Sequence, residues 1–244
     1  MKKYIMFAFA GLLFFNTAIS QEEKKPKSLY ETMYILPKPG MNKQFEEGVA
    51  AHDKKFHASG EDNQAMLRRV EYGNKTGWYV WVMNGTYSSL DSRPEDDTHS
   101  KDWEENVGKY VEEYGTTDLW SLNQELSYGT DKFKNQKRYE TWAVYLKPWQ
   151  GYRFDEAMKK LQKAFEKMGN RTMLVFDSEV SRKGGPDTGL IWGYDKFADL
   201  EADSKLVDTY EEVHGKGSWR FFLEEWKASV EDVDMEHRVK VGDM

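Results

Sequence analysis

The 244-residue chain contains no cysteine. It therefore has no disulfide, no thiolate metal ligand and no cysteine nucleophile. Positive charge is also in short supply, because 35 Lys and Arg residues stand against 42 Asp and Glu, for a formal charge of −7. Binding of nucleic acid without sequence preference requires a basic surface, so no nucleic-acid partner is expected. With 39% hydrophobic and 15% aromatic residues, the chain can nevertheless build a core.

An apolar run near the N-terminus predicts export. Lys2 and Lys3 precede the run at 5–15, and small residues surround the end of the segment at 17–20 before charged residues begin. This order is typical of a secretory signal peptide, so we expect residues 1–20 to be removed and the protein to lie in the periplasm or outside a bacterial cell. The run is too short for a stable membrane span, and no integral span is expected after removal of the signal.

The two halves of the chain repeat the same landmarks. The Tyr-Glu-Thr sequence at 30–32 recurs at 139–141, and the Pro and Phe positions that follow keep the same offset of 109 residues. Further along, Trp81 corresponds to Trp192. Because these landmarks keep both their spacing and their order, the chain is predicted to be a tandem duplication of units of about 110 residues.

Each unit is predicted to run strand, helix, strand, strand, helix, strand. The unit at 29–128 has expected strands at 30–36, 66–72, 77–83 and 119–128, with helices at 43–56 and 101–114. The unit at 139–241 has expected strands at 139–146, 172–179, 188–194 and 233–241, with helices at 154–165 and 204–230. The polar segment 129–138 is the expected linker. This βαββαβ order is ferredoxin-like, so the predicted fold class is α+β.

Two of the strands, 77–83 and 139–146, are apolar or aromatic at nearly every position, as is typical of a strand covered on both faces. With the Pro39 and Pro148 strand ends and the tryptophan strands, the pattern over 29–241 resembles the dimeric α/β-barrel superfamily. The resemblance implies two ferredoxin-like units that pack sheet to sheet in one chain, as a pseudo-dimeric monomer. The superfamily includes cofactor-free monooxygenases, haem-degrading oxygenases, chlorite-dismutase-like haem proteins and members without known activity, so it assigns no function.

His52 is the candidate catalytic residue and a candidate ligand-binding residue. Steps of four, three and four residues place it on one helical stripe with Phe45, Val49 and Phe56, and that stripe faces the sheet. The second unit has Leu161 at the same position, so the scaffold itself does not demand a polar group there. A histidine in this place could ligate haem or move a proton. The alternative is a core histidine bonded to a backbone carbonyl.

His214 is a second candidate ligand residue. It precedes the sequence Gly-Lys-Gly at 215–217, which favours a cap at a helix C-terminus over ligation. No two histidines have the spacing of a metal pair on one helix, so no metal site is expected. No cofactor is predicted, and haem bound through His52 or His214 is the alternative. The remaining histidines lie among polar residues and are expected to be solvated: His57, His99 and His237.

Nine tryptophans are the other unusual feature. Trp78 and Trp81 lie three residues apart on one strand and should face opposite sides of the sheet. Trp142 and Trp192 lie on strands of the second unit. Core packing is the favoured role for these four residues, but a tryptophan left over from the core would line a flat pocket for a planar ligand.

Three functions stay open from the sequence, and whether the protein is an enzyme is not decided. The favoured function is binding of a small apolar or aromatic molecule in the first half of the barrel, with cofactor-free oxygenation as a further step. The first alternative is haem binding. The second is a non-enzymatic envelope protein whose acidic helices meet a partner, and that role would leave the pockets of both halves filled by side chains.

Overall fold

The computed structural model describes residues 26–58, 60, 62–93, 97–169 and 171–242. The predicted signal peptide at 1–20 lies outside the described residues. Within them, no helix is both long and apolar enough to cross a membrane. The first unit consists of β1 (Leu29–Pro37), α1 (Asn42–Phe56), β2 (Ala65–Tyr72), β3 (Tyr79–Gly85), α2 (Tyr87–Asp91), α3 (Asp97–Asn106), η1 (Gly108–Tyr110) and β4 (Val111–Leu122).

The second unit repeats this order with more helix. It consists of β5 (Arg138–Leu146), α5 (Gly151–Met168), β6 (Leu174–Ser178), β7 (Thr188–Tyr194), η2 (Phe197–Lys205), α6 (Leu206–His214), α7 (Ser218–Ser229) and β8 (Val230–Lys240). A short helix, α4 (Thr130–Phe133), lies in the segment predicted as a linker, and its Phe133 is buried against Tyr139 and Leu174. The linker therefore contributes to the core as well as joining the units.

The eight strands form one closed barrel in the order β1-β3-β2-β8-β5-β7-β6-β4. Each unit supplies four adjacent strands in the ferredoxin-like order, β4-β1-β3-β2 and β8-β5-β7-β6. The units join at two antiparallel seams, β2 with β8 and β4 with β6. The predicted tandem architecture is confirmed, and the core closes within a single chain.

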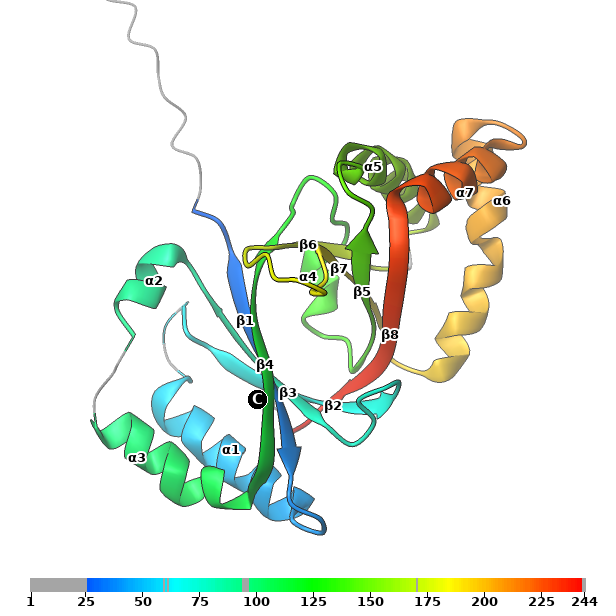
Figure 1. The fold of residues 1–244 in the computed structure, drawn as a ribbon. Helices are drawn as coiled ribbons and strands as arrows, with labels where there is room; N and C mark the ends of the chain where they lie inside the picture. The colour runs from blue at the N-terminus through cyan, green and yellow to red at the C-terminus, as the bar shows by residue number, and fades with distance from the viewer. Residues whose placement is uncertain (1–25, 59, 61, 94–96, 170, 243–244) are drawn as a thin grey trace, which may run out of the picture.

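The closed sheet has two faces, because successive side chains of a strand point to opposite sides. On β3, Tyr79, Trp81 and Met83 pack with the helix α1, whereas Val80 and Val82 pack inside the barrel. Figure 1 shows α1 and α3 on one side of the barrel and α5, α6 and α7 on the other. The molecule thus has three spaces in which a site could form: two helix–sheet layers and the barrel interior.

The first unit departs from prediction after its second helix. The expected helix at 101–114 ends as α3 at Asn106, and β4 begins at Val111 rather than at residue 119. The carboxylates Glu112 and Glu113 therefore lie on a strand rather than on a helix. The reason is tertiary: β4 pairs with β1 along most of its length, from Leu29 with Ser121 to Pro37 with Val111, and this pairing overrides the local helical pattern.

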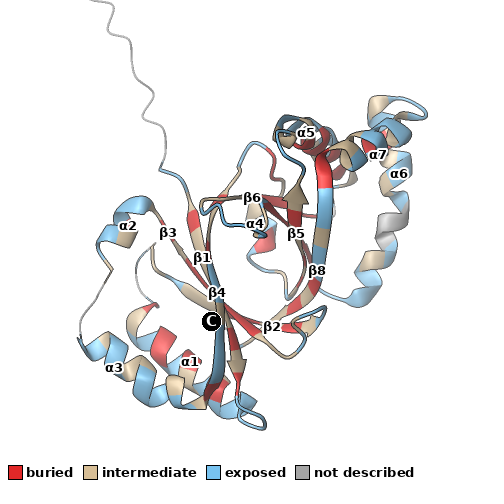
Figure 2. Ribbon diagram, viewed as in Figure 1, coloured by how far each residue is buried: buried red, intermediate tan, exposed pale blue. Residues whose placement is uncertain are grey.

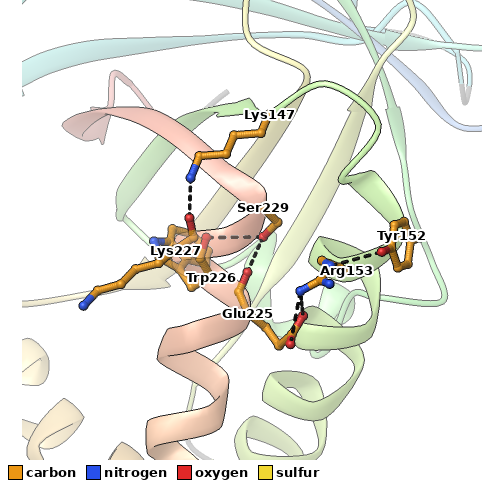
Figure 3. A network of polar contacts seen from close by, with 7 residues as sticks. All are labelled: Lys147, Tyr152, Arg153, Glu225, Trp226, Lys227 and Ser229. Carbon is orange, nitrogen blue, oxygen red and sulfur yellow. Dashed lines mark hydrogen bonds and ion pairs between the residues drawn. The ribbon is translucent and has the colours of Figure 1, made fainter.

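The predicted helix at 204–230 is two helices. It is interrupted by Gly215 and Gly217, whose φ angles of 98° and 82° lie in the region that favours glycine. The end of α7 is then fixed to the start of α5 by polar contacts (Figure 3). Arg153 Nη1 donates to Glu225 Oε2 at 3.2 Å, and Lys147 Nζ donates to the carbonyl of Lys227. These contacts join the end of α7 to the start of α5 on the outside of the second unit.

Candidate functional site

The first unit contains a pocket of about 440 Å³ between its helices and the outer face of its sheet. Helix α1 forms one wall, because its apolar stripe packs Phe45 and Val49 onto the sheet. Helix α3 closes the pocket from the other side. It has no buried residue of its own, as its exposed and intermediate colouring in Figure 2 shows, and its His99 and Trp103 line the pocket.

His52 lies on α1 and points into this pocket, as the helical stripe predicts. It is 1% exposed. Its Nδ1 lies 3.0 Å from Oδ2 of Asp102 on α3, and the other carboxylate oxygen of Asp102 accepts from Lys55 Nζ at 2.9 Å. A carboxylate accepts hydrogen bonds, so Nδ1 of His52 carries the proton. Its Nε2 is buried and has no hydrogen-bond partner among the described residues.

His57 caps the C-terminus of α1 and turns into the same pocket. It is 6% exposed, and its Nδ1 lies 2.9 Å from the backbone oxygen of Asn63. A carbonyl oxygen can only accept, so Nδ1 donates and Nε2 presents a lone pair. Burial lowers the pKa of His57 to about 4, and it also lowers the pKa of His52. Both rings are therefore neutral at pH 7, which is the state in which imidazole ligates a metal.

His99 on α3 completes the cluster. Its Nε2 lies 3.2 Å from Nε2 of His57, and its ring centroid lies 4.7 Å from that of His52. One ligand nitrogen from each of the three histidines lies within 4.8 Å of the others. Two ligands of a tetrahedral zinc ion at 2.0–2.1 Å are about 3.4 Å apart. The 3.2 Å between Nε2 of His57 and Nε2 of His99 is close to this spacing.

The rest of the pocket is divided between an apolar and a charged side. Phe56 packs against His52 at a tilt and Trp103 packs edge-on, with ring centroids at 4.9 and 5.0 Å, and the Trp81 ring lies 5.4 Å from that of His57. On the charged side, Arg93 Nη2 donates to Glu31 Oε2 at 2.7 Å. A group bound at the three nitrogens would therefore meet aromatic rings on one side and an ion pair on the other.

The equivalent layer of the second unit is filled. Leu161 occupies the place of His52 and is 5% exposed. It packs in a large apolar cluster with Phe154, Phe165 and Tyr210 from the helices. Two of the candidate tryptophans belong to this core, where their rings meet at a centroid distance of 4.9 Å: Trp142 and Trp192. Their role in the structure is packing.

The remaining candidates divide between three locations. Trp81 faces the first-unit pocket and donates from Nε1 to Asp53 at 3.2 Å. Trp78 faces the barrel interior, where its ring meets Tyr34, so the two tryptophans lie on opposite faces as predicted. His214 ends α6, and its Nε2 lies 2.8 Å from the carbonyl of Lys160. That contact is the predicted capping role, made to a neighbouring helix.

The expectation that His57, His99 and His237 are solvated is wrong for His57, which is buried. His99 is half-buried. His237 is half-buried too, with its Nδ1 2.9 Å from the hydroxyl of Tyr194. The sequence argument against a metal site considered only spacing on one helix, whereas the clustered histidines come from two helices and a helix cap. The only sequence signal was the position of His57 directly after the helix that carries His52.

No protein-family model and no curated protein matches the sequence, but solved structures match the fold. A candidate monooxygenase from Fusobacterium nucleatum superposes with a TM-score of 0.61 at 8% identity, covering 90% of this chain and 94% of its own. Chlorite dismutase from Candidatus Nitrospira defluvii superposes with a TM-score of 0.53 at 8% identity, covering 88% and 92%. The protein has the dimeric α/β-barrel fold. This tandem barrel shares its architecture with those proteins, and at such identities the likeness extends to the fold alone.

Haem does not fit the histidines of this tandem barrel. In the first unit, the rings of His99 and Trp103 lie 4.7 and 5.0 Å from the His52 ring and occupy the space that a porphyrin plane would need. In the second unit, the corresponding layer is packed with apolar side chains, and His214 is engaged at the surface. The donor set and its surroundings suit a bare metal ion better.

Proposed function

We propose that the first unit binds a divalent transition-metal ion through His52, His57 and His99. The observation that carries this proposal is the cluster of the three histidines: one ring nitrogen of each lies within 4.8 Å of the others, and Nε2 of His57 lies 3.2 Å from Nε2 of His99. A buried imidazole nitrogen without a partner costs free energy, and coordination would recover it. Imidazole ligands suit zinc, copper, nickel and iron.

The outer contacts of the histidines support the same function. Imidazoles that ligate metals usually donate their other N–H to a carboxylate or a backbone carbonyl, which fixes the tautomer. Asp102 serves His52 in this way, and the backbone of Asn63 serves His57. Three protein ligands leave one position open, the arrangement typical of catalytic rather than structural zinc sites.

The open position would face the pocket, where a small molecule with an apolar or aromatic body meets Trp81, Met33 and Met83. Metal-assisted chemistry suits this donor set better than cofactor-free oxygenation does. A protein whose role was only to bind a partner through its acidic helices would have both pockets filled by side chains. The first-unit pocket is open instead. We also propose an exported location: besides the predicted signal, a site built without thiolates would survive oxidising conditions.

Titration of chelator-treated protein with Zn²⁺ and Co²⁺ tests the metal site. We expect one ion per chain, measured by calorimetry, and visible absorption from Co²⁺ in a low-coordinate site. His57→Ala should weaken binding by at least about 100-fold, more than the loss typical of an outer-shell contact.

The matched control is His214→Ala, which removes a histidine from the surface of the second unit and should leave affinity unchanged. Wild-type protein that binds neither ion would refute the proposal, as would equal effects of the two substitutions.

A further inference from the structure

The barrel interior is a second open space, on the other face of the sheet from most of the histidine pocket, although His57 lines both. It has a volume of about 1380 Å³ and is lined by both units. Its walls are the inward-facing residues of the strands, and Phe133 of α4 contributes from the linker. An interior of this kind is usually filled by side chains in a barrel of eight strands. The open volume inside this barrel is therefore unusual.

Two ion pairs face this space. Arg238 donates from Nε to Glu236 at 2.8 Å, and from Nη2 to the Tyr34 hydroxyl at 2.7 Å. At the edge of the space, Arg182 donates from Nε and Nη2 to the two carboxylate oxygens of Asp118, at 3.1 and 3.3 Å. These two ion pairs are internally neutral.

Arg68 also lines this space and is itself buried. Only 6% of it is exposed, and no carboxylate among the described residues pairs with it. Its Nε is buried without a hydrogen-bond partner, and its Nη2 contacts only the sulfur of Met66 at 3.2 Å. Burial lowers its pKa to about 10, so the guanidinium remains charged at pH 7. A buried charge without a counter-charge is costly, and an anion in the adjoining space would compensate it.

The surroundings of Arg68 indicate what the anion carries with it. The guanidinium carbon lies 3.9 Å from the ring centroid of Tyr139 and 5.5 Å from that of Phe133. Tyr30, Trp120 and Phe176 extend this aromatic wall. The hydroxyl of Thr141 also lines the space, and it is buried with no hydrogen-bond partner among the described residues. The wall around Arg68 thus offers a buried positive charge beside several aromatic rings, and other charged and polar side chains line the rest of the space.

We propose that the barrel interior binds a small aromatic carboxylate whose carboxylate pairs with Arg68. The planar guanidinium matches a carboxylate in a two-bond arrangement. A single uncompensated positive charge balances a singly charged carboxylate better than it balances a phosphate dianion. The aromatic wall provides the apolar contacts that a free inorganic anion could not use.

Calorimetric titration with four small probes tests this site: benzoate, its neutral analogue benzamide, acetate and inorganic phosphate. Chelator-treated protein is used throughout, so that coordination of a carboxylate to the histidine site is excluded. We expect saturable binding of benzoate at one molecule per chain, at least about tenfold tighter than benzamide, acetate or phosphate.

Substitutions locate the binding. Arg68→Met should weaken benzoate binding by at least about tenfold, because it removes the charge but keeps a long side chain. Arg220→Met, at an exposed position on α7, is the matched control and should not change it. If Arg68→Met does not fold, the ratio of benzoate to benzamide affinity on wild-type protein decides the question.

Four results would overturn the proposal: no benzoate binding up to about 10 mM, equal affinity for benzoate and benzamide, tighter binding of phosphate, or unchanged affinity in folded Arg68→Met. Each is independent of the metal proposal, because no metal is present in the experiment.

Discussion

The helix layers on the two sides of the barrel derive from one repeated pattern, yet they are packed differently. In the second unit, α5 is covered by α6 and α7, and Leu161 lies in a continuous apolar core. In the first unit, α3 meets α1 with histidines, an aspartate and a tryptophan at the contact. One copy uses its layer for stability, whereas the other leaves a polar pocket in the same place. The substitutions below test this contrast.

The largest effect is expected in the filled layer. Leu161→Ala should lower the free energy of unfolding by about 3 kcal/mol, because it opens a cavity in a core with little freedom to collapse. Chemical denaturation measures the change. Leu223→Ala, at a partly exposed position on α7, should change stability by less than about 0.5 kcal/mol. A small loss for Leu161→Ala would mean that the second layer is looser than its packing indicates.

In the polar layer, the contact between Asp102 and His52 should matter for metal binding. Asp102→Asn should weaken Zn²⁺ binding by about 10- to 100-fold, since the amide carries no charge to hold the His52 tautomer and ring. The control is Asp97→Asn, an exposed carboxylate in the first turn of the same helix. Equal Zn²⁺ affinity of the two variants would show that Asp102 does not position His52.

Replacing His52 by the residue of the other unit tests the comparison directly. His52→Leu should change the free energy of unfolding by less than about 1 kcal/mol, because the lost hydrogen bond to Asp102 is offset by removal of the unpaired Nε2. Metal binding should be lost at the same time. Thermal unfolding and Zn²⁺ titration of one preparation measure both. A loss of more than about 2 kcal/mol would make His52 a structural residue.

The smallest effect concerns the seam between the units. Glu179, after β6, accepts hydrogen bonds from Tyr87 at 2.5 Å and from Lys27 at 2.9 Å, both in the first half of the chain. Hydrogen bonds from Ser121, Tyr87 and Lys27 lower the pKa of Glu179 from 4.5 to about 2. The folded carboxylate holds its proton less tightly than the unfolded one, so its stabilisation is complete above pH 4.5 and lost as the pH falls towards 2.

Glu179→Gln should therefore reduce the loss of stability between pH 7 and pH 3 by up to about 1 kcal/mol, measured by urea unfolding at both values. Glu156→Gln, an exposed carboxylate paired within α5, should leave the pH dependence as in the wild type. Identical pH dependence of the free energy of unfolding in wild type and Glu179→Gln would show that the Glu179 contacts between the units do not stabilise the protein.

Local patterns were sufficient for the architecture. The 109-residue offset predicted the duplication, and strand and helix periodicity predicted both βαββαβ units and the inward direction of His52. The errors lay where long-range pairing competes with local preference: β4 begins at Val111 because β1 offers it a partner. The aromatic positions of Trp78 and Trp81 were correctly assigned to opposite faces, because a strand's alternation is a local property.

The residues of the two proposed sites were harder to predict from the sequence than the architecture was. His52 was identifiable because its helical stripe and its counterpart Leu161 are both readable from the chain. Its association with His99 was not, since the two residues are 47 positions apart and meet only because α3 packs across α1. Arg68 likewise shows nothing unusual until the strands close and bury it with no ion-pair partner among the described residues. Periodicity determines which way a side chain points, whereas only the tertiary structure determines what it meets there.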